Sequence, residues 1–217
     1  MISTRNLDAL PTIENLRRLT RSLATLDAVL MPDWQWRYYS YNSNWSAGET
    51  MASMRDGSGD SYFILFSEAG VVIGGRGHES AVAAAMADGG LQLPGIIDAI
   101  PAVFERFVNE PAFSVSEMTF CLWRKAGSTA WEVGPVELLE GHDPDGSEGL
   151  LYILDGKPET YAAWAKEYYE VEVDIDAVRR IYEHTPLSNE LVSLLNPEVT
   201  IDDLAEDIAE IGYPVSR

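Results

Sequence analysis

Basic residues and cysteines are both scarce in this sequence, and each shortage excludes a class of protein. The chain of 217 residues has 15 Lys and Arg against 35 Asp and Glu, a formal net charge of −20. A negative field of this size repels nucleic acid and anionic membrane, so we expect neither as a partner. The one cysteine, Cys121, can form no disulfide within the chain. Its apolar neighbours at positions 119–123 indicate a buried, inert thiol.

Long apolar runs are also missing. No segment approaches the ~20 consecutive apolar residues that span a bilayer. Residues 1–10 contain Arg5 and Asp8 and lack the apolar centre of a signal peptide. We therefore expect a cytoplasmic protein. The hydrophobic content of 46% is ample for a folded core, because disordered chains have far fewer apolar residues.

The familiar catalytic signatures are missing as well. The sequence has no Gly-x-Ser-x-Gly elbow, no dinucleotide-binding glycine motif and no Walker A loop. Of its three histidines, only His78 precedes a glutamate, and no second histidine follows to complete a zinc motif. The sequence therefore favours a non-enzymatic protein without a cofactor. No catalytic residue and no metal ligand is assigned.

The acidic excess is concentrated toward the C-terminus. Residues 1–60 carry 6 basic and 7 acidic side chains, residues 61–140 carry 4 and 10, and residues 141–217 carry 5 and 18. Such acids can simply be the solvated faces of helices. Concentrated charge of one sign, however, costs self-repulsion, and it speeds association with basic proteins. The alternative is thus a surface that attracts a basic protein partner.

The order of patterns indicates an α+β fold: an N-terminal helix, a largely antiparallel sheet of about five or six strands, and a helical C-terminal region. Residues 12–30 repeat leucine at spacings of three and four, which predicts a helix with Thr12 as its N-cap. Strand character is found at residues 36–41, 61–66, 71–75, 117–124, 130–133 and 136–139. Helices are expected at residues 94–108, 158–169, 174–183, 187–195 and 200–211. Strands followed by helices, rather than strict alternation, favour antiparallel pairing.

Residues 1–217 are expected to form a single domain. The Gly-, Asp- and Pro-rich segment 140–149 is the weakest joint and marks the alternative boundary, after which residues 150–217 are mainly helical. The short apolar run 150–154 favours a single fold, because it has the composition to pack back against the sheet.

Two glycine-rich loops beside predicted strands form the candidate binding site. Residues 54–60 lead into one strand of a predicted hairpin, and residues 74–80 leave the other. Glycine lets the backbone approach a ligand closely, and the acidic, basic and imidazole groups of these loops suit an anion, a cation or acid–base chemistry. A hairpin would bring both loops to one end of the sheet. The residues concerned are Arg55, Asp56, Asp60, His78 and Glu79. The simpler interpretation is two ordinary turns.

Aromatic residues are dense between positions 34 and 45. Trp36 and Trp45 are the candidate binding residues of this segment. One interpretation is a strand that packs against the N-terminal helix. The other is an exposed recognition surface, because Trp and Tyr are enriched at protein interfaces. A nucleic-acid stacking platform would need basic neighbours, and Arg37 alone does not supply them.

Several segments resemble an uncharacterised bacterial protein family. They are residues 36–79, above all Met51–Asp60 and Phe63–Phe66, and the stretches Leu154–Tyr161 and Ile211–Pro214. The resemblance implies a bacterial cytoplasmic origin and no known activity. The acidic α+β character is also similar in style to toxin-immunity proteins of the SUKH kind, whose Leu-Pro-x-x-Tyr and Asn-Gly hallmarks are not evident here. No functional residue is carried over.

Three functional hypotheses follow from the sequence. The first is a non-enzymatic acidic interaction protein, of an immunity or inhibitor type, that binds a basic protein through its acidic C-terminal helices, with the aromatic segment 34–45 as an additional contact. The second is a small-ligand or metal-binding domain, with an enzymatic activity left open, whose site lies between loops 54–60 and 74–80. The third is a structural domain without a discrete site.

Overall fold

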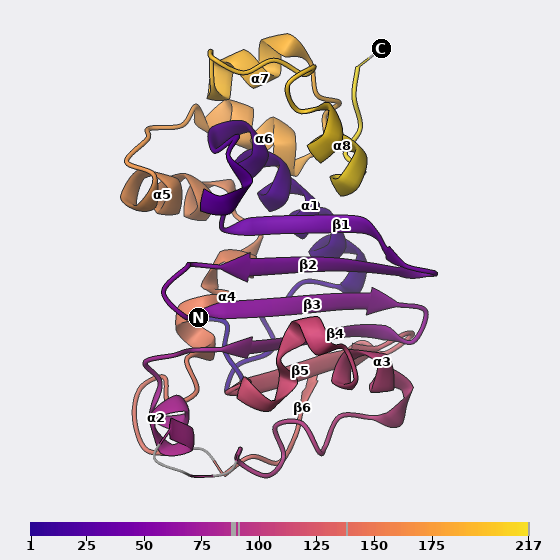
Figure 1. The fold of residues 1–217 in the computed structure, drawn as a ribbon, viewed down its shortest axis with the longest axis vertical. Helices are drawn as coiled ribbons and strands as arrows, with labels where there is room; N and C mark the ends of the chain where they lie inside the picture. The colour runs from indigo at the N-terminus through magenta and orange to yellow at the C-terminus, as the bar shows by residue number, and fades with distance from the viewer. Residues whose placement is uncertain (88–89, 91, 138, 217) are drawn as a thin grey trace.

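Six antiparallel strands form the centre of the computed structural model, which describes residues 1–87, 90, 92–137 and 139–216. Each strand pairs with its neighbours in sequence, so the order across the sheet is the order along the chain (Figure 1). The strands are β1 (Tyr39–Ser46), β2 (Glu49–Arg55), β3 (Ser61–Ser67), β4 (Gly70–Arg76), β5 (Phe120–Lys125) and β6 (Glu132–Val133).

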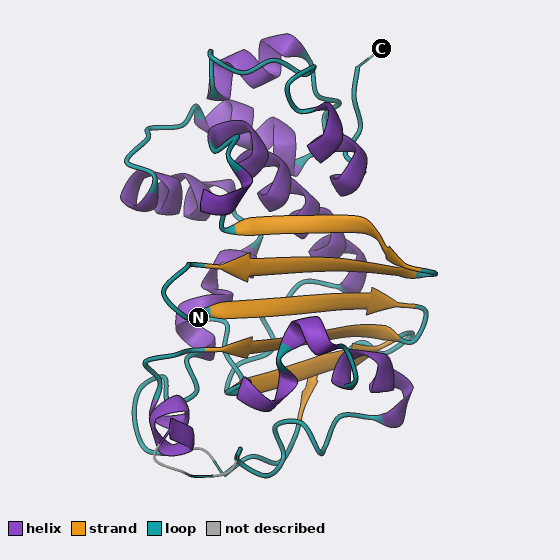
Figure 2. Cartoon of the chain, viewed as in Figure 1, coloured by secondary structure: helices purple, strands orange, loops and turns teal. Residues whose placement is uncertain are grey.

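Helices extend the fold on both sides of this sheet (Figure 2). The α-helices are α1 (Ile13–Leu30), α2 (Ala81–Ala87), α3 (Glu105–Val108), α4 (Ser147–Leu151), α5 (Pro158–Tyr168), α6 (Ile175–Tyr182), α7 (Asn189–Leu195) and α8 (Ala205–Ile211). The 3₁₀ helices are η1 (Trp34–Trp36), η2 (Ala102–Phe104), η3 (Pro111–Phe113), η4 (Val115–Glu117) and η5 (Tyr152–Asp155). The C-terminal helices gather beyond the edge strand β1 (Figure 1). The predicted α+β class is confirmed, including its N-terminal helix and helical C-terminal region.

The sheet is buried on both faces. Alternate side chains of a strand point to opposite faces, and in β4 Val71 and Ile73 join one core while Val72 joins the other. The same alternation in β5 places Cys121 in the second core, where it is 1% exposed. Burial raises the pKa of the Cys121 thiol, so the inert thiol expected from the sequence fits its surroundings.

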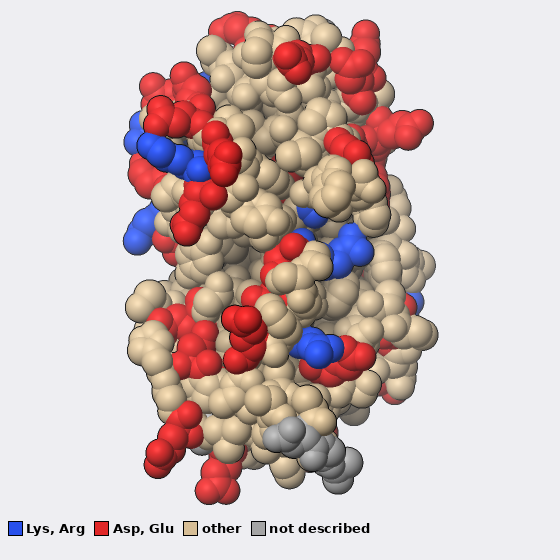
Figure 3. Space-filling view, turned by 60° about the vertical axis from the view of Figure 1, so that its left-hand side comes forward, with Lys and Arg blue, Asp and Glu red and all other residues tan. Residues whose placement is uncertain are grey.

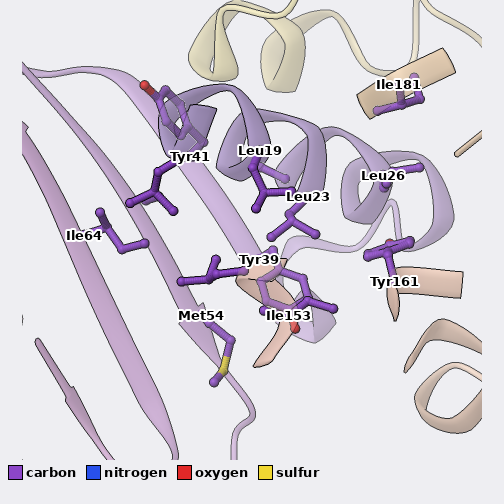
Figure 4. Packing of buried hydrophobic residues seen from close by; sticks show 14 of the residues in the cluster. Leu19, Leu23, Leu26, Tyr39, Tyr41, Met54, Ile64, Ile153, Tyr161 and Ile181 are labelled. Atoms are coloured by element: carbon purple, nitrogen blue, oxygen red, sulfur yellow. The ribbon is translucent and has the colours of Figure 1, made fainter. Parts of the chain in front are cut away.

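The leucine face of α1 joins the sheet to the C-terminal helices. Thr12 caps the helix as predicted, because its hydroxyl accepts from the Asn15 N–H at 3.3 Å. Figure 4 shows Leu19 and Leu23 directed toward the strands and Leu26 close to Tyr161 and Ile181. All these side chains are buried, and each leucine so buried contributes roughly 1.5–3 kcal/mol.

One carboxylate lies inside this apolar contact. Asp27 of α1 is fully buried and accepts hydrogen bonds from the Tyr38 and Tyr39 N–H groups at 3.0 and 2.9 Å. The hydroxyls of Tyr161 and Tyr169 donate to it at 2.8 and 2.9 Å. Burial raises the pKa of Asp27 to about 6, although these donors oppose the rise. Through these hydrogen bonds, Asp27 of α1 connects this helix with the start of β1 and with α5.

Two strand predictions are corrected. The strand expected from Trp36 begins at Tyr39, because the Asp33 side chain accepts from the Gln35 N–H and so caps the 3₁₀ turn η1. No strand was expected at β2, whose polar, Met-rich sequence lacks strand character. It pairs with β1 and β3 on its two sides, and this tertiary pairing overrides local preference.

Two further elements differ from expectation. The segment 94–108 does not form one helix but turns followed by η2 and α3, because Pro101 interrupts the helical hydrogen bonds. In the expected strand 136–139, Val136 and Glu137 are irregular, and Leu138 lies outside the described residues.

Candidate functional site

The ends of four neighbouring strands, β1 to β4, lie side by side at one end of the sheet. The two candidate loops leave the sheet there. Tyr39 pairs with Met54 at this end of the sheet, and Ser61 lies opposite both Arg55 and Arg76. The loop from β2 to β3 and the segment after β4 are consequently neighbours (Figure 1). The structure therefore brings together Asp56, Asp60, His78 and Glu79, four of the sequence-predicted site residues.

Asp56 organises the first loop. One of its carboxylate oxygens accepts from the backbone N–H groups of Ser58, Gly59 and Asp60 at 2.9, 3.0 and 2.9 Å. Its other oxygen accepts from the Ser58 hydroxyl. Partial burial raises the pKa of Asp56, but these hydrogen bonds outweigh that effect and lower it. Asp56 is therefore a charged group that fixes the loop.

Asp60 and His78 join the two loops. The His78 backbone N–H donates to Asp60 Oδ1 at 2.7 Å, and the ring atom Nδ1 lies 2.7 Å from the same oxygen. His78 Nε2 faces Glu79 at 3.8 Å. Gly59 permits this approach: its φ is +129°, and a Cβ there would lie 3.1 Å from the His78 Cβ. The loops thus form one acidic cluster around an imidazole.

This cluster has the ligand types of a small cation site. One oxygen from each of Asp56 and Asp60 and one ring nitrogen of His78 lie within 4.8 Å of one another. Carboxylate and imidazole ligands of this kind bind Zn²⁺ or Mn²⁺. Both carboxylates already accept hydrogen bonds from the protein, so a cation would compete with those donors.

Aromatic rings adjoin the acidic cluster. Tyr38, just before β1, lies 3.9 Å from the Tyr168 ring of α5 between centroids. Burial, Tyr168, and the charges of Asp56 and Asp60 raise the pKa of Tyr38, in that order, so the tyrosine is close to both acids. Tyr168 is 44% exposed and stacks on Trp164. Tyr168 was not among the site residues expected from the sequence, although its spacing of four from Trp164 places both rings on one helix face.

Arg55 contacts an aromatic ring and lines a small pocket with Arg76 and Glu117. Its guanidinium lies 4.9 Å from the centre of the Trp34 ring, a cation–π distance. Trp34 is 55% exposed, and Trp36 in the same turn is 63% exposed. Trp45 is separate from these residues, because it lies at the other end of β1 and stacks on Phe113 at 5.7 Å. The aromatic segment therefore divides into an exposed turn with two tryptophans, two buried tyrosines, and the half-buried Tyr38 and Trp45.

We call these neighbouring groups the strand-end face. It comprises Trp34, Trp36, Tyr38, Arg55, Asp56, Asp60, His78, Glu79 and Tyr168. Glu170 and Glu172, both exposed, lie two and four residues after Tyr168. A shallow hollow of about 230 Å³ lies beside the face, and Asp60, Glu79 and Asp143 line it. In Figure 3, which turns this side of the molecule forward, acidic side chains outnumber basic ones.

The titration of the histidines tests this arrangement. The hydrogen bond to Asp60 raises the pKa of His78 above 6.5, whereas burial and the nearby Arg18 and Arg21 lower that of His184. The His78 ion pair therefore stabilises the fold below pH 6.5, and this contribution is lost as the pH rises through the raised pKa. In an NMR titration, Asp60→Asn should bring the pKa of His78 back toward 6.5 and leave that of His184 unchanged. Equal titration of His78 in both proteins would contradict the Asp60–His78 contact.

No protein-family model, no curated protein and no solved structure matches this chain. Among the described residues, none of the helices is both long and apolar enough to cross a membrane.

Proposed function

We propose that this chain is a non-enzymatic acidic protein that binds a basic protein through its strand-end face. The observation that supports this most is that exposed aromatic rings and carboxylates occur together on this face. The aromatic residues are Trp34, Trp36 and Tyr168, and the carboxylates are those of Asp56, Asp60 and Glu79. Aromatic faces and carboxylates are the two kinds of group that attract Lys and Arg side chains. Exposed Trp and Tyr are also the residues that dominate interface energies.

The net charge supports the same partner. The long-range field of a chain with a charge of −20 speeds the approach of a basic protein and opposes nucleic acid and anionic membrane. The acidic α+β character, which is similar to that of SUKH-type toxin-immunity proteins, suggests what kind of basic protein the partner is. The partner is then a basic toxin, such as a nuclease, inhibited in a bacterial cytoplasm.

A capture experiment with matched variants tests the proposal. The tagged chain is incubated with bacterial lysate at about 50 mM and about 300 mM NaCl, because the higher salt screens exposed charges. A second bait carries Glu79→Gln, Glu170→Gln and Glu172→Gln at the strand-end face. A control bait carries Glu190→Gln, Glu198→Gln and Asp202→Asn, all exposed and on the side of α7.

The expected result is a stoichiometric basic protein that binds wild type and control at low salt, leaves at high salt and does not bind the strand-end variant. A partner that binds all three baits equally would contradict the proposed surface. So would the absence of any partner at both salt concentrations.

A divalent-cation site is the second candidate function, favoured by the grouping of Asp56, Asp60 and His78. Binding of Mn²⁺ or Zn²⁺ to the folded chain would raise its melting temperature by mass action. The rise should be lost in Asp60→Asn and kept in Asp33→Asn, because the Asp33 carboxylate caps η1 and is not part of the Asp56–Asp60–His78 group. An equal rise in both variants, or none in wild type, would exclude this site.

A further inference from the structure

A second groove lies away from the strand-end face, between α1 and the α5–α6 pair. Its volume is about 510 Å³, within the range of small-molecule sites. Three segments distant in sequence line it: residues 9–19, residues 155–158 and the end of α6 with Glu183. Pro11, Leu19 and Pro158 give it an apolar wall, while Arg18 and Tyr182 contribute polar groups.

Hydrogen bonds within the protein hold the walls in place. The Arg18 guanidinium donates to the Glu183 carbonyl at 3.2 Å, and His184 Nε2 lies 2.9 Å from the Arg18 carbonyl. These contacts tie α1 to the end of α6. On the α5 side, Asp155 accepts from the Lys157 N–H and the Thr160 hydroxyl at 2.9 and 2.7 Å. These contacts within the chain fix the walls of the groove relative to one another.

Two polar groups that line the groove, Arg18 and Tyr182, have hydrogen-bond donors that the described residues leave unused. Arg179 already pairs with Glu159 and Asp176. Arg18, by contrast, donates only to a main-chain carbonyl and forms no ion pair with a described carboxylate. The Tyr182 hydroxyl oxygen is buried and has no partner among the described residues. A buried polar group without a partner is uncommon, and a bound ligand or water commonly satisfies it.

The local charge also differs from that of the whole chain. Three of the fifteen basic residues, Arg17, Arg18 and Arg21, lie on α1, and Arg179 and Arg180 lie on α6. One third of the basic side chains is thus carried by two helices that pack together. Arg17 and Arg21, however, lie over the rings of Phe66 and Tyr41. In the groove itself, the two arginines Arg18 and Arg179 are balanced by two carboxylates, Asp155 and Glu183, so the lining is neutral although the whole chain is strongly acidic.

We propose that this groove binds a small organic carboxylate. The Arg18 guanidinium, with most of its donors unused, pairs with the carboxylate in the planar geometry that suits both groups. The Tyr182 hydroxyl donates a second hydrogen bond to the ligand. Pro11, Leu19 and Pro158 contact its apolar part. The inference is independent of the proposed partner at the strand-end face, since the two sites share no residue.

Benzoate and benzamide form a matched pair of probes, because they differ in charge but hardly in shape. Calorimetric titration of the purified chain with each, and with succinate against succinamide, measures the affinity directly. We expect the carboxylates to bind and the amides to bind at least about tenfold more weakly, the usual scale for losing one charged hydrogen-bonded pair.

Two groove variants and one control complete the test. Arg18→Met keeps the length of the side chain and should weaken carboxylate binding at least about tenfold, while Tyr182→Phe removes only one hydroxyl and should weaken it about threefold to tenfold. Arg124→Met, on β5, should bind as wild type does. Circular dichroism establishes that each variant is folded. Equal binding of acid and amide, equal binding by Arg18→Met and wild type, or no binding of any carboxylate would overturn the proposal.

Discussion

Asp27→Ala is expected to lower the free energy of unfolding by about 3–5 kcal/mol at pH 7, the range for breaking a buried charged network. The substitution leaves two backbone N–H groups and the hydroxyls of Tyr161 and Tyr169 without their acceptor, in a site that solvent does not reach. Urea denaturation measures the loss. Asp33→Ala is the matched control, since Asp33 is exposed and should cost about 1 kcal/mol as a surface cap. Equal losses in the two variants would show that Asp27 does not hold α1, β1 and α5 together.

The same carboxylate should give stability a pH dependence of definite sign. Its pKa is about 6 in the folded chain against 3.8 for the ordinary group, so the folded state retains the proton between these values. Stability contributed by Asp27 is therefore present below about pH 4 and is lost as the pH rises to about 6, by about 3 kcal/mol in total. Asp27→Asn cannot titrate. Between pH 4 and pH 6.5, which covers most of this range, the difference in unfolding free energy between wild type and Asp27→Asn should shift by about 2 kcal/mol in favour of the variant. A constant difference would contradict the raised pKa.

The second large effect is expected at the strand-end face. Trp34→Ala, Trp36→Ala and Tyr168→Ala together should weaken binding of the captured basic partner by at least about 100-fold, because truncating one aromatic hot spot commonly costs about 2 kcal/mol or more. The three side chains are exposed, so the variant should keep its fold.

Surface plasmon resonance separates this effect from that of charge. The aromatic variant should change mainly the dissociation rate, whereas Glu79→Gln with Glu170→Gln should change mainly the association rate and its salt dependence. Trp45→Phe is the matched aromatic control, since Trp45 lies at the other end of β1 and Phe preserves its stacking on Phe113. Loss of affinity in the control alone would place the interface elsewhere.

The predictable parts of the fold were those with strong local signals. The leucine spacing of residues 12–30 and Thr12 gave α1 and its cap. The hairpin of β3 and β4 followed from two short apolar runs joined by the turn-like residues 67–70. β2 could not be predicted from its own sequence, because it forms a strand only through pairing with β1 and β3 on its two sides. The helical spacing of apolar residues in 94–108 predicted one continuous helix. Pro101 interrupts that helix, and the prediction did not take it into account.

The candidate site was predictable only where the chain itself brings residues together. The hairpin placed Asp60 near His78, since Ser61 and Arg76 are paired neighbours in the sheet. Tyr168 lies beside Tyr38, although the two residues are about 130 positions apart in the sequence. It is brought there by tertiary packing, because α5 packs against α6 and η5 and is held by hydrogen bonds to the buried Asp27. The groove beside Arg18 and Tyr182 is likewise a product of tertiary packing, and no local pattern marks it.

Hydrogen–deuterium exchange of the chain, alone and with its captured basic partner, tests the central claim most directly. The proposed function predicts added protection at residues 33–38, 56–60, 78–79 and 167–172, which form the strand-end face and its acidic border. The α7–α8 side, residues 189–211, should exchange at the same rate in both states. Protection confined to that side, with none at the strand-end face, would contradict the account.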